Sequence, residues 1–125
     1  MPRFVVLHHE TPPGYPRPSH YDLMLECGEL ESGGALRTWA LPGLPEVETE
    51  IAAEELAPHR LAYLDYEGEV SGDRGKVTRV VAGEYVTLEE TANLLRIKIA
   101  GQNLAGEMLL VRASQEARSW LVTFR

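Results

Sequence analysis

The sequence has one cysteine, no long apolar run and few basic residues, and each of these shortages excludes a class of protein. Cys27 alone cannot close an intrachain disulfide, so the chain is not a disulfide-stabilised secreted scaffold. Its longest apolar runs, FVVL and MLLV, are far shorter than the about 20 residues that a membrane helix needs. Because the N-terminus also has no secretory leader pattern, we expect a cytoplasmic protein without a membrane partner.

Charge sets a further limit, because 19 acidic residues outnumber 12 basic ones and the net charge is −7. A protein that follows the phosphate backbone of nucleic acids has the opposite balance. Basic residues nevertheless gather at Arg74, Lys76 and Arg79. The sequence therefore argues against an extended nucleic-acid interface but permits a small cationic pocket for one phosphate.

The remaining composition is typical of one globular domain. The 125 residues are 44% hydrophobic and 25% charged, as is usual for a single domain of this length. Such a chain buries enough surface to fold without a disulfide or a structural metal. We therefore expect one monomeric domain over residues 1–125, in which any metal is functional rather than structural.

Alternation of apolar and polar residues dominates the chain and predicts short β-strands. The expected strands are 3–10, 20–27, 36–41, 61–70, 76–82, 84–90, 94–100, 106–113 and 118–124. Between Pro45 and Pro58, early glutamates after a proline predict a helix instead. The expected fold is mainly β, a compact and closed or nearly closed barrel of about eight or nine short strands with one short helix.

The segment HYDLMLEC at 20–27 carries the most chemical information. Alternate side chains of a strand face opposite sides. Those placed toward the core are Tyr21, Leu23, Leu25 and Cys27, and those on the other face are His20, Asp22, Met24 and Glu26. An imidazole beside a carboxylate can bind a divalent cation, and His9, before the proline-rich loop 10–19, can complete a two-histidine, one-carboxylate set. The alternative is a hydrogen-bonded surface pair.

Two other groups permit both a functional and a structural interpretation. His59 and Tyr63, four residues apart, form either part of a site or the edge of the core. The turn SGDRGK at 71–76 presents Arg74 and Lys76. Backbone amides and cations in such a turn can hold an anion, although a plain hairpin turn with solvated charges has the same pattern.

Taken together, these segments resemble the 3′-phosphoesterase domain of bacterial DNA ligase D and its stand-alone relatives. FVVLHH at 4–9 resembles the opening strand and first histidine of that family, and HYDLMLE at 20–26 resembles its His-Tyr-Asp-Leu-Arg-Leu-Glu motif. Residues 36–42 (LRTWALP) and 59–69 (HRLAYLDYEGE) are similar to the next two blocks, and residues 106–112 and 119–121 to the closing strands.

The resemblance implies a compact β-barrel that binds Mn²⁺, or another divalent transition metal, through His9, His20 and Asp22. It also implies that His59 and Tyr63 contact the phosphate. Met24 departs from the family pattern, because it stands where the family has a phosphate-binding arginine. A thioether cannot replace a forked cation, so we expect Arg74 or Lys76 to supply the charge.

The function expected from this resemblance is metal-dependent phosphoesterase activity on 3′ ends of DNA or RNA, removing a 3′-phosphate or a 3′-ribonucleotide during repair. Its partners would be nucleic-acid 3′ ends and a DNA ligase or polymerase that acts in repair. Two alternatives remain open at this point. Met24 and the acidic balance favour a non-catalytic module that binds DNA ends or a repair protein, and the acidic surface also suits a hydrolase of small phosphoesters.

Overall fold

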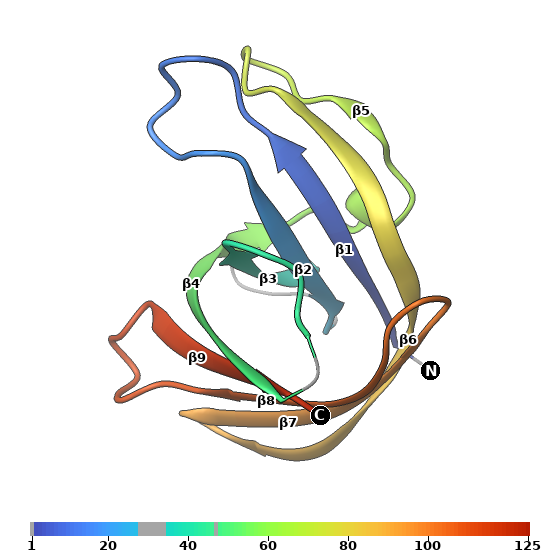
Figure 1. Cartoon of the computed structure of the whole chain (residues 1–125), viewed down its shortest axis with the longest axis vertical. Helices are drawn as coiled ribbons and strands as arrows, with labels where there is room; N and C mark the ends of the chain where they lie inside the picture. The colour runs from blue at the N-terminus through green and yellow to red at the C-terminus, as the bar shows by residue number, and fades with distance from the viewer. Residues whose placement is uncertain (1, 28–34, 47) are drawn as a thin grey trace.

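A computed structural model describes residues 2–27, 35–46 and 48–125 (Figure 1). These residues form nine antiparallel strands, all in one sheet, and one 3-10 turn. The elements in chain order are β1 (Arg3–Glu10), β2 (His20–Glu26), β3 (Leu36–Leu41), β4 (Thr49–His59), η1 (Leu61–Leu64), β5 (Gly68–Glu69), β6 (Lys76–Thr91), β7 (Leu94–Gly101), β8 (Ala105–Val111) and β9 (Ser119–Phe124).

The sheet curls into a near-closed ring, which confirms the expected mainly β, barrel-like class. Its strand order is β1-β2-β3-β4-β9-β8-β7-β6-β5, and an additional pairing between β1 and β6 joins its two sides. β6 is long enough to pair with β1 through its first half and with β7 through its second half. Closure leaves few unpaired strand edges, which are a liability in open sheets.

The helix expected between Pro45 and Pro58 is wrong. The described part of this segment contains strand β4, which pairs with β3 on one side and β9 on the other, while residue 47 lies outside the described residues. Helix propensity is a weak preference that tertiary structure overrides. Here a helix would leave β3 and β9 without the strand that connects them.

Two expected strand boundaries are also wrong. Residues 61–70 do not form one strand, because the 3-10 turn η1 and the two-residue strand β5 occupy them. The segments 76–82 and 84–90 are one continuous strand, β6. Gly83 lies inside this strand where β7 approaches closely, since a Cβ there would lie 2.1 Å from the carbonyl oxygen of Ala100 on β7.

Both faces of β1 and β2 are buried, each in a separate apolar cluster. Phe4, Val6, Leu23 and Leu25 belong to the large cluster inside the barrel, with Trp39 and Trp120. The opposite face contributes to a smaller cluster of Val5, Leu7, Met24, Leu36, Leu64 and Val77. Met24, on the same face of β2 as His20 and Asp22, is therefore only 1% exposed, whereas Cys27, expected in the core, is exposed.

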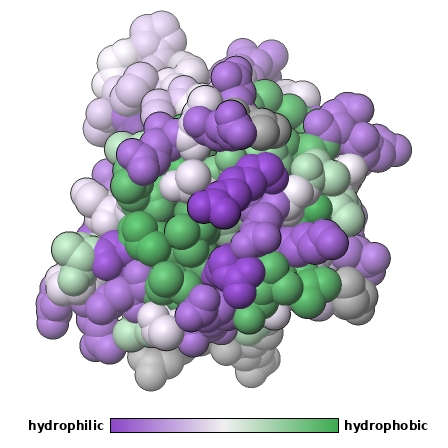
Figure 2. All heavy atoms as spheres, turned by 60° about the horizontal axis from the view of Figure 1, so that its bottom comes forward, coloured by the Kyte–Doolittle hydropathy of each residue, from purple (hydrophilic) through white to green (hydrophobic). Residues whose placement is uncertain are grey.

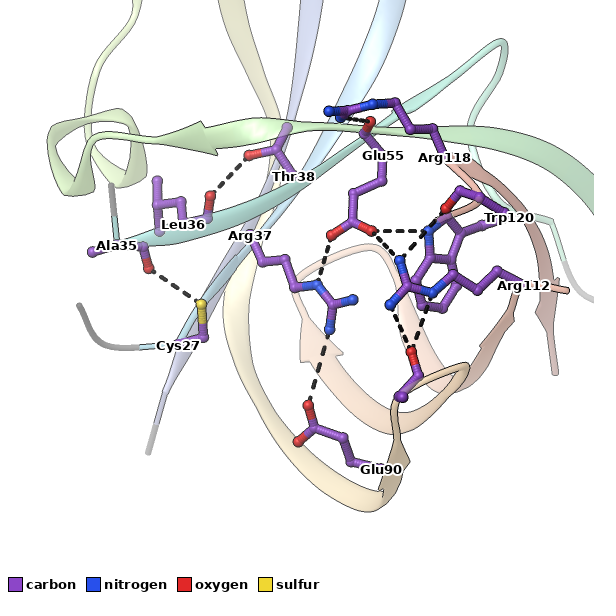
Figure 3. Close-up of polar contacts among 12 residues, drawn as sticks. Cys27, Ala35, Leu36, Arg37, Thr38, Glu55, Glu90, Arg112, Arg118 and Trp120 are labelled. Carbon is purple, nitrogen blue, oxygen red and sulfur yellow. Dashed lines mark hydrogen bonds and ion pairs between the residues drawn. The ribbon is translucent and has the colours of Figure 1, made fainter. Parts of the chain in front are cut away.

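An ionic cluster joins β3, β4 and the region around β9 (Figure 3). The Glu55 carboxylate accepts hydrogen bonds from Arg37 Nε at 2.8 Å, Arg112 Nη1 at 3.4 Å and Trp120 Nε1 at 3.0 Å. Both guanidinium groups also lie within 5 Å of a tryptophan ring, at 4.8 Å for Arg37 over Trp39 and 4.7 Å for Arg112 over Trp120. Glu55 thus connects three segments around the two tryptophans.

The face that carries β7, β8 and β9 shows apolar side chains interrupted by charged ones (Figure 2). The large hydrophobic residues exposed over the molecule come from several segments: Leu44, Leu61, Tyr66, Val80, Val86, Leu88 and Leu121. Scattered apolar side chains of this kind are normal on soluble domains. Within the described residues, no helix has the length and apolar character needed to cross a bilayer.

Candidate metal centre

Three potential ligands converge where β1 ends and β2 begins. His9 and His20 are directly opposite each other in the antiparallel pair, and Asp22 follows two residues later on the same face. One ligand atom from each of the three side chains lies within 4.8 Å of the others. The side chains are 13%, 7% and 3% exposed, respectively, so the group is shielded from solvent. His8 faces away and stacks on Tyr21.

Backbone carbonyls orient both imidazoles. The carbonyl oxygen of Arg74 lies 2.7 Å from His9 Nε2, and that of Pro18 lies 2.9 Å from His20 Nδ1. A carbonyl oxygen only accepts hydrogen bonds, so each of these nitrogens carries the proton. The other ring nitrogens face Asp22, at 3.7 Å from His9 Nδ1 to Oδ2 and 3.0 Å from His20 Nε2 to Oδ1. Such outer contacts are typical of histidines that ligate metals.

Asp22 Oδ1 is a buried oxygen that accepts no well-aligned hydrogen bond from the described residues. Its near neighbour, His20 Nε2, presents a lone pair when that imidazole is neutral, so two electron-rich atoms face each other at 3.0 Å. Buried polar atoms normally have partners, and each exception needs an explanation. A divalent cation bound between the three side chains would satisfy both atoms, so the donor set fits a metal.

The charges of the group reinforce one another. The adjacent Asp22 carboxylate raises the pKa of His9 above its usual value of 6.5, although burial acts in the opposite direction. Burial alone would raise the pKa of Asp22, but the neighbouring imidazoles of His20 and His9 outweigh it and hold that pKa below 3.8. Asp22 is therefore ionised at neutral pH and available as the anionic ligand.

The three side chains line a cavity of about 140 Å³ that the chain closes from several directions. His59 from the end of β4 and Tyr63 from η1 line it as well, with their rings in an edge-to-face contact at 5.6 Å between centroids. Met24 is also part of the lining. Burial lowers the pKa of His59 below 6.5 more strongly than the Asp22 charge raises it. His59 is therefore neutral at pH 7.

No family model and no curated protein matches the chain. The case for a functional site therefore rests on the geometry of the residues themselves. All five residues expected around the metal and phosphate, His9, His20, Asp22, His59 and Tyr63, line the same cavity. They come from β1, β2, β4 and η1, so the fold and not the sequence spacing brings them together.

The two cations expected to replace the missing arginine lie in different places. Arg74 lines the cavity, and its side chain donates to the carbonyl oxygen of Ser71 at 2.6 Å. Lys76 instead lines a neighbouring depression, where its Nζ lies 3.9 Å from Glu10. Met24 belongs to the smaller apolar cluster with Leu7 and Val77 and also lines the cavity, without a charge of its own. Arg74 is thus the better placed of the two predicted cations.

Sequence analysis missed Arg17 and Tyr15, which also line the cavity. Both belong to the proline-rich loop between β1 and β2, and the Arg17 guanidinium contacts Glu54 of β4 at 2.7 Å. The available signal was the position of the loop, since a segment flanked by two candidate ligands must lie beside the site. Irregular loops have no side-chain periodicity, so the sequence does not indicate which way Arg17 points.

Gly75 holds the 71–75 turn against β1, and we expect Gly75→Ala to disturb the site. Its φ is +93°, and a Cβ there would lie 1.9 Å from the Glu10 carbonyl oxygen. The turn must move, which should cost about 1–3 kcal/mol of folding free energy and displace the Arg74 carbonyl from His9. Urea unfolding and Mn²⁺ titration measure both effects.

Gly72→Ala is the matched control for that variant. Gly72 also has a positive φ, +78°, but a Cβ there would meet its nearest atom, the Arg74 Nε, only at 3.7 Å. The control therefore introduces a similar backbone penalty without the collision with β1. Equal effects of the two substitutions on stability and Mn²⁺ affinity would show that the close approach of Gly75 to Glu10 is unimportant.

Proposed function

We propose that this protein is a metal-dependent phosphoesterase that removes a 3′-phosphate or a 3′-ribonucleotide from the ends of DNA or RNA strands. The observation that carries the proposal is the convergence of His9, His20 and Asp22 beside His59 and Tyr63 in one cavity. The order of motifs that resembles the 3′-phosphoesterase domain of DNA ligase D adds the substrate class. By the same resemblance, Mn²⁺ is the proposed metal.

The residues of the cavity suit phosphoryl chemistry. A divalent metal bound there would act as a Lewis acid toward a phosphoryl oxygen. His59 donates from Nδ1 to the Ala57 carbonyl at 3.0 Å, so Nε2 of the neutral ring is left to accept a proton. Arg74 supplies positive charge beside the position where charge develops during transfer.

The size of the cavity supports a substrate that enters by one end. At about 140 Å³ it is smaller than the range of roughly 300–1,000 Å³ typical of sites that enclose a whole small molecule. A terminal phosphoryl group and its ester oxygens would occupy the cavity while the remainder of the substrate stayed outside. The end of a polynucleotide meets this requirement.

The decisive experiment is an assay of the purified protein with Mn²⁺ on a 3′-phosphorylated strand, a strand ending in a 3′-ribonucleotide and an aryl phosphate. Release of phosphate or nucleoside from the strands, abolished by a chelator and by His59→Ala, supports the proposal. Turnover of the aryl phosphate alone would favour a hydrolase of small phosphoesters. Binding of strand ends without turnover would favour the non-catalytic module. The specific argument for that module is Met24, which stands where the resembled family has a phosphate-binding arginine.

The pH dependence of Mn²⁺ binding tests the ligand set separately from activity. A metal displaces protons from its histidine ligands, and the pKa of His9 lies above 6.5. Affinity should therefore fall as the pH is lowered through the pKa of His9, by about tenfold per pH unit for each histidine that becomes protonated. Asp22 adds nothing in this range, because its pKa lies below 3.8. Calorimetric titration checks this, and a flat profile down to about pH 5.5 would contradict histidine ligation.

A further inference from the structure

An open groove of about 600 Å³ lies beside the metal cavity. The loop between β1 and β2 forms one side of it through residues 15–18, and Glu54 and Arg74 complete the lining. Tyr15, Arg17 and Arg74 line the groove and the cavity alike, so the two spaces adjoin. Figure 1 shows the 11–19 loop and the 70–75 turn at the same end of the molecule.

The loop that presents Arg17 and Tyr15 is held in place before any ligand binds. Thr11 N donates to Ser19 Oγ at 3.0 Å across the base of the loop, and Tyr15 N donates to the Pro12 carbonyl at 3.2 Å. Four prolines restrict its backbone further. A side chain fixed in its bound position loses less entropy when it binds a ligand, which suits this loop to recognition.

The charges of the groove favour a phosphodiester. The Arg17–Glu54 pair joins Nη2 to Oε2 at 2.7 Å, with side chains 35% and 46% exposed. Solvent-exposed ion pairs contribute little to stability, so the arginine can exchange its carboxylate for a phosphate at small cost. Arg74, whose guanidinium also bonds Ser71, adds a second cation to the lining. Forked contacts from arginine to phosphate are among the strongest charge-assisted hydrogen bonds.

Tyr15 adds an aromatic surface between the groove and the cavity. Its ring centroid lies 6.3 Å from that of His9, and the ring is partly exposed. Bases of single strands stack on such rings with little regard to sequence. An aromatic ring that shares its groove with two arginines offers both the stacking surface and the cations with which proteins bind single strands.

We propose that this groove binds the internal phosphodiester and the base next to the reacting 3′ end, with Arg17 on the phosphate and Tyr15 on the base. The groove thereby selects a polynucleotide strand over a small phosphoester. This inference deepens the proposed function and rests on it for the direction of the strand. Glu54 holds Arg17 in position in the free protein and limits affinity, because it repels the phosphate that replaces it.

The test measures binding of a short fluorescent DNA strand, which ends in a 3′-hydroxyl and contains no ribonucleotide, by anisotropy with Mn²⁺ present. This strand has no terminal phosphate to lose, so it reports the groove without turnover. Arg17→Ala should weaken binding about tenfold or more and reduce the slope of log affinity against log salt by about 0.7, the value for one phosphate contact on a single strand. Arg17→Lys should restore part of the affinity, and Glu54→Gln should increase it.

Arg79→Ala is the matched control, because Arg79 is an exposed arginine of β6 outside the lining of both spaces. It should change strand affinity less than about twofold. The second readout is kcat/KM on a nucleoside 3′-phosphate, which has no internal phosphodiester to place in the groove, and Arg17→Ala should reduce this value much less than it reduces strand binding.

The possible outcomes distinguish a failure of the groove proposal from a failure of the proposed function. If strand affinity is unchanged in Arg17→Ala, or falls equally in Arg79→Ala, the proposal that the groove binds the strand is wrong, even if the enzyme is active. An equal loss of strand binding and of kcat/KM on the nucleoside 3′-phosphate would assign Arg17 to the terminal phosphate and also overturn it. If no substrate is hydrolysed but strand binding depends on Arg17, the groove stands and the phosphoesterase proposal fails.

Discussion

Replacing Asp22 with asparagine is expected to weaken Mn²⁺ binding by at least about 100-fold, because even residues that only orient metal ligands are worth about 10–100-fold. Asp22 is the sole carboxylate in the described cluster, and its Oδ1 has no aligned hydrogen bond. The substitution removes the negative charge at constant size. The asparagine amide can also donate to the lone pair of His20 Nε2, so the fold should survive. Calorimetric Mn²⁺ titration and circular dichroism measure the two properties.

Asp65→Asn serves as the control, since Asp65 is an exposed aspartate outside the cavity lining, and its carboxylate contacts Arg3, toward the other end of β1 from His9, at 2.7 Å. It should leave Mn²⁺ affinity unchanged. If Asp22→Asn binds Mn²⁺ as well as the unmodified protein, the aspartate is only the partner of a buried histidine pair. The metal-dependent mechanism would then lose its anionic ligand.

The sequence predicted the parts of the site that depend on local strand geometry. His20 and Asp22 share a face because side chains in a strand alternate, and this holds wherever the strand lies. The proximity of His9 followed from the hairpin arrangement of two strands joined by one loop. The burial of β2 was predicted only in part. Leu23 and Leu25 are buried as expected, but Met24, on the opposite face, is buried as well. Alternation cannot show that a second layer, formed by η1 and its neighbours, covers that face.

The remaining misses have a common physical cause, which is that long-range packing decided between local alternatives. Residues 49–59 combine alanine and glutamate in a pattern that suits a helix, and they form β4 because β3 and β9 both pair with them. Arg17 lies beside the cavity, where it pairs with Glu54 of β4. In both cases the determining partner is distant in sequence, and a single sequence contains no signal for it.

Glu55→Ala should produce the largest loss of stability of the substitutions considered, about 2–4 kcal/mol. Its carboxylate, 18% exposed, lies between Arg37 and Arg112, which are 22% and 14% exposed (Figure 3). Removing the shared anion leaves two poorly solvated cations close together and an indole N–H of Trp120 without its acceptor. Removing one partner of such a group is far more costly than the net stability of the group itself.

Urea unfolding of Glu55→Ala and of Glu89→Ala distinguishes this mechanism from a general effect of lost charge. Glu89 also pairs with an arginine, Arg96 at 3.5 Å, but its side chain is 54% exposed, so its removal should cost less than about 0.5 kcal/mol. Glu55→Gln keeps an acceptor for Trp120 and should fall between the two. Similar losses for Glu55→Ala and Glu89→Ala would mean that the cluster is solvated in solution and that pairing with β3 and β9 alone holds β4 in the barrel. Metal affinity should remain unchanged in Glu55→Ala below its unfolding transition, because Glu55 contributes to neither the ligand set nor the cavity lining.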